Sequence, residues 1–392
     1  MRVLIAPDSF KGSLGAATAA AALARGWLSV RPGDQVTELP LADGGEGTLD
    51  VLAATVPGAR WHRARVTGPG GAAVRARWLE LPALHGRENA APGAGMAVVE
   101  LARASGLPLL AHPDPMRAQT TGLGELLGRA LDAGAGRILV GLGGSAATDG
   151  GTGALAALGA RFFDAAGQPL PLGGGALASL ARADLSGLRA PPNGGVTCLT
   201  DVTAPLLGPR GAAAVFGPQK GADGPQIARL EAGLARLARV LGGDPAAPGA
   251  GAAGGTGYGL AAAWGAGLAP GAAELGHLAG LDRALASADL VITGEGRFDE
   301  TSLTGKTCGT VIAAAAAAGV PVAVVAGQAS GAFAGPGPAG AGAPGGIPAP
   351  VTVVTLAALA GGTAAAISRP RRWLREAGNR LASDIRAESF PA

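Results

Sequence analysis

The chain has 392 residues and a formal net charge of +3, and 69 of its residues are glycine and 29 are proline. A hydrophobic fraction of 48% excludes a disordered chain, and the length predicts roughly two to three folded domains. The positive charge is spread along the sequence, which is not the basic stripe of a nucleic-acid-binding protein.

Cysteine content and apolar runs indicate a cytoplasmic protein. Cys198 and Cys308 are too few for a disulfide framework or a zinc cluster, which suits a reducing compartment. Pro7 and Asp8 interrupt the apolar N-terminal stretch, so we expect no signal peptide. No apolar run of about 18 or more residues predicts a membrane span. We therefore expect neither a membrane nor a nucleic acid as a partner.

The N-terminal region predicts two strands that end in polar loops. Residues 2–6 form an apolar run, and Asp8, Ser9 and Lys11 follow it. Ser13 is predicted to cap a helix over residues 15–28. A second strand over residues 36–39 is followed by two carboxylates among glycines: Asp43, Gly44, Gly45 and Glu46.

The middle of the chain changes pattern. Residues 61–81 alternate loosely between apolar and polar side chains, as antiparallel strands do. Residues 120–133 predict an amphipathic helix, and residues 138–140 predict a strand that is buried on both faces.

A glycine-rich loop follows that buried strand, in the sequence GLGGSAATDGG. Gly143 and Gly144 have no Cβ, so their N–H groups could converge on an anion. Ser145 and Asp149 add a hydroxyl and a carboxylate that a tight turn does not need. A plain strand-to-helix turn remains the alternative, in which Asp149, like Asp8, only shapes a turn or caps a helix.

The remainder of the chain again alternates strands with helices. A strand is predicted over residues 195–199, and Asp201 follows it. Residues 215–223 are predicted as a loop carrying Lys220, and residues 226–241 as an amphipathic helix. A strand over residues 289–293 is predicted to end before Glu295, Asp299, Gly305 and Lys306. Further elements are a helix to residue 318, strands over 320–325 and 351–356, a loop over 331–350, and a helix over 372–386.

This order predicts an α/β protein with two domains. Strands and helices alternate at both ends of the chain, so we expect a parallel α/β domain from residues 1–60 and 280–392. Residues 61–279 are expected to form an inserted second domain.

Lysine usage points to phosphate chemistry. Three of the 31 basic residues are lysines, namely Lys11, Lys220 and Lys306, and each is adjacent to a glycine in the sequence. A compact ammonium beside flexible backbone suits phosphate oxygens, although three lysines could also fall beside glycine by chance.

Two common nucleotide motifs do not fit. A Walker sequence needs glycine where Glu300 stands, so LTGKT is not a strict P-loop. The G-x-G-x-x-A pattern ending at Ala146 lacks a helix that follows directly, because residues 148–151 interrupt it.

The strand ends nevertheless carry the groups that phosphoryl transfer uses. Paired carboxylates could bind Mg²⁺, and lysines with backbone amides could bind phosphoryl oxygens. None of the four histidines lies in these loops, so an aspartate is the expected proton acceptor.

Six motifs in order closely resemble the bacterial glycerate kinases of glyoxylate and glucarate metabolism. They read IAPDSFKGS, LPLADGGEGT, VGLGGSAATDGG, TDVTAPLLGPRGAAAVFGPQKGA, GAGAAGGTGYG and ITGEGRFDETSLTGK. The resemblance implies ATP-dependent phosphorylation of D-glycerate with Mg²⁺, with 2-phosphoglycerate favoured over 3-phosphoglycerate as product. It also implies a flavodoxin-like domain from both chain ends and an inserted domain similar to restriction endonucleases.

Under this resemblance, ATP and glycerate are expected to meet between the two domains. We expect Lys11, Asp43 and Asp201 to be catalytic, with Asp43 orienting or deprotonating the glycerate hydroxyl. Asp201, Glu295 and Asp299 are the expected metal ligands. Substrate and nucleotide are expected to contact Ser9, Gly44, Gly45, Glu46, Gly143, Gly144, Ser145, Asp149, Lys220, Gly305 and Lys306.

The chain departs from the family pattern at three positions. The family usually has asparagine where Thr148 and Ala204 stand and glutamine where Glu300 stands, so we give these residues no ligand role. The alternative functions are an NAD(P)-dependent hydroxy-acid oxidoreductase and a non-catalytic sugar-acid or nucleotide sensor. The sequence leaves open the position phosphorylated and any assembly into a homo-oligomer.

Overall fold

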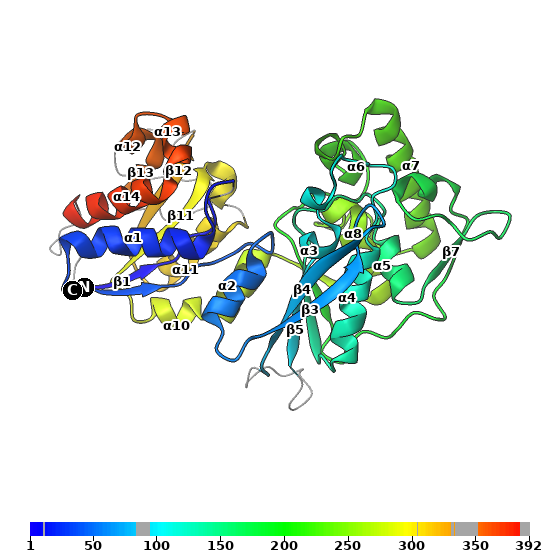
Figure 1. Cartoon of the computed structure of the whole chain (residues 1–392), viewed down its shortest axis with the longest axis horizontal. Helices are drawn as coiled ribbons and strands as arrows, with labels where there is room; N and C mark the ends of the chain where they lie inside the picture. Colours follow the sequence, from blue (N-terminus) through cyan, green and yellow to red (C-terminus); the bar gives the residue numbers. More distant parts are fainter. Residues whose placement is uncertain (11, 84–94, 304, 331–332, 334–351, 385–392) are drawn as a thin grey trace. The chain divides into compact units, whose positions relative to one another are not determined.

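The computed structural model describes residues 1–10, 12–83, 95–303, 305–330, 333 and 352–384 (Figure 1). Lys11 and nearly all of the predicted loop over 331–350 lie outside these residues. The chain divides into two compact units. Unit 1 comprises residues 1–43, 50–56 and 270–392, and unit 2 comprises residues 44–49 and 57–269.

Unit 1 is built on a parallel sheet of five strands, in the order β13-β12-β11-β1-β2. All four pairings of neighbouring strands are parallel. The strand order reverses at β1, which pairs with β2 on one side and β11 on the other. The strands are β1 (Arg2–Ile5), β2 (Gln35–Glu38), β11 (Leu290–Phe298), β12 (Val322–Ala329) and β13 (Thr352–Thr355).

Helices cover both faces of this sheet, because successive side chains of its strands point to opposite faces. Val3 and Ile5 of β1 pack with α1 (Ala16–Val30) and α14 (Pro370–Asp384). Leu4 packs on the other face, with α11 (Thr307–Ala317) and α10 (Leu281–Leu285). Figure 1 shows α1 and α14 side by side. The remaining helices are α9 (Gly271–Ala279), η4 (Glu300–Leu303), α12 (Leu356–Ala360) and α13 (Thr363–Ser368). Helix α2 (Thr48–Thr55) begins in the unit 2 segment 44–49 and continues in the unit 1 segment 50–56.

Two predictions for unit 1 are wrong in detail. Ser13 does not cap α1: Gly15 is the N-cap residue, and the Ser13 hydroxyl donates to the Phe10 carbonyl oxygen at 2.8 Å. The strand predicted to end at Thr293 continues to Phe298, so Glu295 lies within β11. One of the glycines that suggested its end, Gly294, is needed for close packing, since a Cβ there would lie 2.1 Å from the Val325 carbonyl oxygen of β12.

Unit 2 contains a mixed sheet of six strands, in the order β10-β9-β6-β5-β4-β3. The predicted antiparallel pair is confirmed as β3 (Arg60–Thr67) and β4 (Ala73–Leu81). β4 is also antiparallel to β5 (Met96–Glu100), and the other pairings are parallel. The other strands are β6 (Arg137–Gly141), β9 (Val196–Leu199) and β10 (Gly267–Ala269), with a separate hairpin of β7 (Arg161–Phe163) and β8 (Arg182–Asp184).

The core of unit 2 lies between this sheet and its helices, which contribute Leu123, Leu155 and Leu234 to one cluster. The predicted amphipathic helices are α4 (Thr121–Asp132) and α7 (Gly224–Leu241), the latter with a capping box between Asp223 and Gln226. The other helices are α3 (Ala102–Ser105), η1 (Leu107–Leu109), α5 (Thr152–Ala157), η2 (Gly174–Ser179), α6 (Ala212–Phe216), η3 (Pro218–Lys220) and α8 (Ala252–Trp264).

The prediction of a loop over residues 215–223 is wrong. The segment contains the end of α6 and the turn η3, which carries Lys220. The compact units also differ in extent from the ranges expected from the sequence. Residues 44–49 and 57–60 group with unit 2, and residues 270–279 group with unit 1. Within the described part of the chain, no helix has the length and apolar character needed to span a membrane.

Candidate active site

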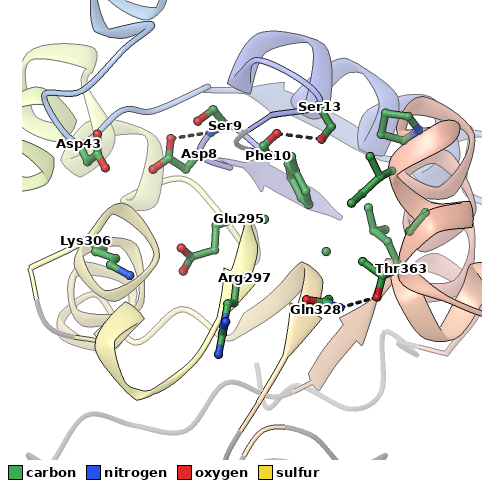
Figure 2. Close-up of a pocket in the computed structure, with 16 residues that line it drawn as sticks. Asp8, Ser9, Phe10, Ser13, Asp43, Glu295, Arg297, Lys306, Gln328 and Thr363 are labelled. Carbon is green, nitrogen blue, oxygen red and sulfur yellow. Dashed lines mark hydrogen bonds between the residues drawn. The ribbon is translucent and has the colours of Figure 1, made fainter. Parts of the chain in front are cut away.

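Unit 1 contains a pocket of about 310 Å³ at the carboxyl ends of β1, β11 and β12, hereafter the unit 1 pocket. Its lining combines three carboxylates with two cations and an apolar wall. Ligands of open parallel sheets bind at this end of the strands, next to the point where the strand order reverses. The polar lining residues are Asp8, Ser9, Ser13, Asp43, Glu295, Arg297, Lys306, Gln328 and Thr363 (Figure 2).

Glu295 differs from the other two carboxylates in having a buried oxygen with no described hydrogen-bond donor. Its Oε1 is buried and accepts no hydrogen bond from any residue that the structure describes. Burial raises the pKa of Glu295 above its usual value, although Ser302 and Lys306 oppose the shift. A buried carboxylate oxygen that faces a pocket without a donor is suited to bind a cation or a proton of a ligand.

Asp8 and Lys306 lie in the same part of the pocket as Glu295 (Figure 2). Asp8 is 8% exposed and accepts hydrogen bonds from the Ser9 N–H at 2.5 Å and from the Thr307 hydroxyl at 2.8 Å. Thr307 is the first residue of α11, and Lys306 is its N-cap residue. The positive end of that helix and the Lys306 ammonium, which donates to the Thr301 hydroxyl at 2.9 Å, therefore serve the same pocket.

Asp299 and Gly305 are placed differently from Glu295. Neither lines the unit 1 pocket. Asp299 accepts hydrogen bonds from the Thr301 N–H and hydroxyl, at 2.9 and 2.6 Å, and lies 3.3 Å from the Arg297 guanidinium. The Thr301 hydroxyl chiefly lowers the pKa of Asp299. Gly305 is exposed and has a positive φ of 78°, as a turn requires.

Unit 2 has its own pocket of about 600 Å³, hereafter the unit 2 pocket. It brings together several residues of the predicted site: Glu46, Gly143, Gly144, Ser145 and Lys220. Arg75, Arg103 and Thr200 add polar groups, and Leu107, Leu142 and Phe216 form an apolar wall. Two further predicted residues, Gly44 and Gly45, belong to the same unit.

The two glycine-rich loops pack backbone against backbone within unit 2. A Cβ on Gly141 would lie 2.4 Å from the Gly44 carbonyl oxygen, and a Cβ on Gly143 would lie 2.6 Å from the Gly45 Cα. No side chain fits at these contacts, so glycine is required. Gly44 and Gly144 also have positive φ values, of 90° and 73°.

Asp149 is held by the protein itself. Its side chain is fully buried and accepts hydrogen bonds from the Thr120 N–H and hydroxyl, at 2.9 and 2.8 Å, and from the N–H groups of Gly151 and Gly153, at 3.1 and 3.2 Å. Burial raises the pKa of Asp149, and these hydrogen bonds oppose the shift. The observed contacts give Asp149 a structural role in the loop, the alternative that the sequence left open.

Lys220 is also deeply buried, at 2% exposure, although it lines the unit 2 pocket. Its ammonium donates to the Ala147 carbonyl oxygen and lies 3.5 Å from the Thr148 hydroxyl. Burial lowers the pKa of Lys220 to about 8, while the charge of Asp149 opposes the shift. The side chain thus ties η3 to the loop over residues 147–149.

Asp201 follows β9 and is half-buried, between Thr200 and Val202, which line the unit 2 pocket. Ser145 is 8% exposed and has weaker contacts than Asp149, with its hydroxyl 3.3 Å from the Ala147 carbonyl oxygen. Tyr258 and Cys198 are buried structural residues, at 2% and 0% exposure. Among the described residues, no group of three or more His, Cys, Asp or Glu side chains is arranged to hold a metal ion.

Several residues that line the pockets were not singled out in the sequence, among them Arg297 and Gln328 in unit 1 and Arg75 and Arg103 in unit 2. Arg297 stands in the quoted motif GEGRFDE and could have been found there. Arg75 and Arg103 lie outside every quoted motif, and no local pattern distinguishes them from the other arginines.

Comparisons with known proteins agree with the family resemblance. A model of the "Glycerate kinase family" matches residues 3–340. A Bacillus subtilis (strain 168) protein named Glycerate kinase is 44% identical over 323 residues, which cover 80% of this chain and 82% of that protein. The Escherichia coli (strain K12) Glycerate 2-kinase is 41% identical over 316 residues, covering 78% and 80% respectively.

A solved structure supports the same relationship. The crystal structure of a candidate glycerate kinase 2 from Salmonella typhimurium LT2 matches 99% of this chain and 99% of its own, with 36% identity and a TM-score of 0.78. Both the sequence and the fold are therefore shared with proteins of one family. The chain belongs to the glycerate kinase family and is an enzyme of the kinase class.

Proposed function

We propose that this protein is an ATP-dependent glycerate 2-kinase, which phosphorylates the 2-hydroxyl of D-glycerate. The observation that carries this proposal is the unit 1 pocket, where carboxylates and cations meet at the ends of parallel strands. Such a set of groups can orient a hydroxyl and neutralise phosphoryl oxygens. The 2-position is favoured because the Escherichia coli relative, 41% identical, is named Glycerate 2-kinase.

The strand order of unit 1 supports a flavodoxin-like domain. Counted within the unit, the order β2-β1-β11-β12-β13 corresponds to 2-1-3-4-5, which is the flavodoxin-like order. In that fold the ligand lies at the reversal between the first and third strands. Here Asp8 follows β1, and Glu295 lies in the carboxyl-terminal half of β11. The likeness of unit 2 to restriction endonucleases stays a prediction.

In the proposed reaction the glycerate hydroxyl oxygen forms a bond to the terminal phosphorus of ATP, the bond between that phosphorus and the bridging oxygen breaks, and ADP leaves. Asp43, which lines the unit 1 pocket, orients the hydroxyl and accepts its proton. Lys306 and Arg297 line the same pocket and stabilise the charge on the transferred group. Lys11 keeps its predicted role in binding phosphoryl oxygens and lies outside the described residues.

The residues of the unit 1 pocket also fit Mg²⁺. This ion prefers oxygen ligands and binds through one or two carboxylates together with substrate phosphates. Glu295 offers a buried oxygen that accepts no hydrogen bond from the described residues, and Asp8 and Asp43 line the same pocket. A Mg²⁺ ion held by these carboxylates would supply positive charge that offsets the charge of the phosphate groups. Asp201 and Asp299 remain predicted ligands that do not line this pocket.

Phosphorus NMR of the product made from ATP and D-glycerate tests the proposal, because it identifies the reaction and the position together. We expect ADP and a phosphomonoester on the secondary carbon. A phosphomonoester on the primary carbon would make the protein a glycerate 3-kinase. An absence of phosphoryl transfer, with active enzyme from the Escherichia coli relative as the control, would contradict the proposal.

A further inference from the structure

Unit 2 also carries a basic surface, which none of the carboxylates of the proposed reaction lines. It is a groove of about 800 Å³, hereafter the arginine groove, lined by five arginines and three alanines. Four of the arginines come from β3 and β4, labelled in Figure 1, and the fifth comes from α3. The five arginines are Arg63, Arg65, Arg75, Arg77 and Arg103.

The register of β3 and β4 sets four of these arginines in two facing pairs. Arg63 lies directly opposite Arg77, and Arg65 lies directly opposite Arg75. Side chains opposite each other in an antiparallel pair are ~4.5–5.5 Å apart at Cβ, and those two residues apart on one strand are about 7 Å apart. The two arginines of each facing pair therefore place like charges opposite each other, which lowers the stability of a strand pair.

Protection of the sheet edge does not account for this arrangement. β3 is an edge strand of its sheet, and charged side chains on an edge prevent pairing with other chains. β4 is an interior strand, however, and arginines on β3 would suffice. Arg75 and Arg77 on β4 add repulsion without adding protection.

Three of the guanidinium groups have no acidic partner among the described residues. Arg103 is paired with Glu100 at 2.8 Å, and Arg77 lies over the Trp61 ring at 4.0 Å from its centroid. Arg63, Arg65 and Arg75 are exposed, and no ion pair joins them to a described carboxylate. The groove therefore concentrates positive charge that an anion could neutralise.

We propose that the arginine groove binds a chain of linked phosphates, either inorganic polyphosphate or the phosphate chain of a nucleotide. Planar guanidinium groups bind phosphate oxygens through two parallel hydrogen bonds, and a two-by-two array offers such contacts to several phosphates at once. A single phosphate or carboxylate would engage one or two arginines and leave the remaining repulsion in place.

The groove also adjoins the unit 2 pocket, because Arg75 and Arg103 line both. A phosphate chain in the groove would thus end next to the Gly143–Gly144 loop. This proposal goes beyond the kinase reaction, since its site contains none of the residues given a role in that reaction. It can fail or succeed independently of glycerate phosphorylation.

The test is titration calorimetry and thermal unfolding of the whole protein with sodium tripolyphosphate at constant ionic strength. Arg63→Gln/Arg65→Gln removes two exposed guanidiniums that line the groove and not the unit 2 pocket. We expect tripolyphosphate to bind the double variant about tenfold more weakly or worse, since each lost contact is a charged hydrogen bond. Arg210→Gln, an exposed arginine elsewhere in unit 2, should bind it as the wild type does.

Two further measurements sharpen the outcome. The unliganded double variant should unfold at the same or a higher temperature, because like charges have been removed, and Arg63→Lys/Arg65→Lys should recover part of the binding. ATP titration separates the sources of the phosphate chain: loss of ATP affinity in the double variant indicates a nucleotide, and loss confined to tripolyphosphate indicates inorganic polyphosphate. The proposal would be overturned if the wild type and the double variant bound tripolyphosphate equally. It would also be overturned if titration of the wild type with tripolyphosphate gave no more heat than titration with sodium chloride.

Discussion

At the scale of single residues, buried carboxylates serve two different purposes in this protein. Asp149 is surrounded by four hydrogen-bond donors of the chain, whereas Glu295 has a buried oxygen that accepts no hydrogen bond from the described residues. The first arrangement stabilises a loop. The second costs stability and leaves an oxygen for chemistry at the unit 1 pocket.

Asp149→Asn tests the structural role of this carboxylate. An amide nitrogen would face N–H and hydroxyl donors, so we expect the free energy of unfolding to fall by about 2–4 kcal/mol. Urea unfolding measures the change. Ser145→Ala, in the same loop, loses hydroxyl contacts of 3.2 to 3.5 Å and no charge, and should cost less than about 1 kcal/mol. A fully stable Asp149→Asn protein without activity would instead make Asp149 a ligand-binding residue.

Asp43→Asn tests the proposed proton acceptor. Because an amide cannot take a proton from the glycerate hydroxyl, we expect kcat to fall by roughly 10²–10⁴-fold. The melting temperature should stay close to that of the wild type. Asp132→Asn, at an exposed position of α4, serves as the matched control and should retain its activity. Near-normal turnover by Asp43→Asn would remove this residue from the reaction.

Glu295→Gln should change the pH dependence of stability and, separately, abolish activity. The pKa of Glu295 is raised by burial, so the folded protein holds this proton more tightly than the unfolded chain. Wild-type stability therefore decreases as the pH rises from the unfolded pKa through the folded one, and glutamine does not titrate. We expect the two proteins to melt alike near pH 4 and Glu295→Gln to be the more stable at pH 8.

Melting temperatures across that range, with kinase assays beside them, measure both properties. Activity should be lost in Glu295→Gln even where its stability is higher. A stability difference that does not change with pH would mean that the Glu295 charge is not the cause.

At the scale of elements, the two glycine-rich loops at the unit 2 pocket pack with their backbones in close contact. Gly143→Ala would place a methyl group 2.6 Å from the Gly45 Cα, and backbone cannot move aside as a flexible side chain can. We expect a loss of about 1–3 kcal/mol in the free energy of unfolding, as for other overpacked sites.

Gly128→Ala is the matched control for that substitution. Gly128 lies inside α4, and its added Cβ would meet no atom closer than 3.5 Å. Alanine should raise the stability by about 0.5–1 kcal/mol, because it favours a helix more than glycine does. Chemical denaturation of both variants compares them. Equal stability changes of the same sign would show that the loop contact is not a steric limit.

The sequence predicted elements well where periodicity was clear and less well where glycine was dense. The amphipathic pattern of α7 and the alternation in β3 and β4 gave the correct element types. β11 was predicted too short because its glycines imitate a strand end, although they permit close approach to β12. α6 and η3 were missed because elements of five and three residues carry too few positions to show a period.

At the scale of the whole molecule, each unit has its own hydrophobic core. Leu4 and Ile5 belong to clusters of unit 1, and Leu123 and Leu234 belong to the cluster of unit 2. Separate cores can unfold separately, so we expect calorimetry to resolve two transitions. Glu295→Gln should shift one of them and Asp149→Asn the other. A single transition that both variants shift alike would mean that the units unfold as one.

The candidate site was predicted residue by residue but not as an arrangement. The pattern of carboxylates and glycines after predicted strands pointed to Asp43 and Glu295. Both residues line the unit 1 pocket. That Asp8 meets Thr307 across almost the full length of the sequence follows from parallel pairing of β1 and β11, which no local pattern encodes. The full burial of Asp149 could not be predicted, because the burial of a residue cannot be read from composition in a glycine-rich loop.

The four hydrogen bonds on Asp149 have a thermodynamic consequence for the neighbouring pocket. They fix the segment from Asp149 to Gly153 and join it to Thr120, so folding itself orders this part of the loop. A molecule that binds at this loop does not have to order it, so binding does not include the entropic cost of loop ordering. The calorimetric signature of docking at this loop should accordingly lack the large unfavourable entropy that accompanies coupled folding.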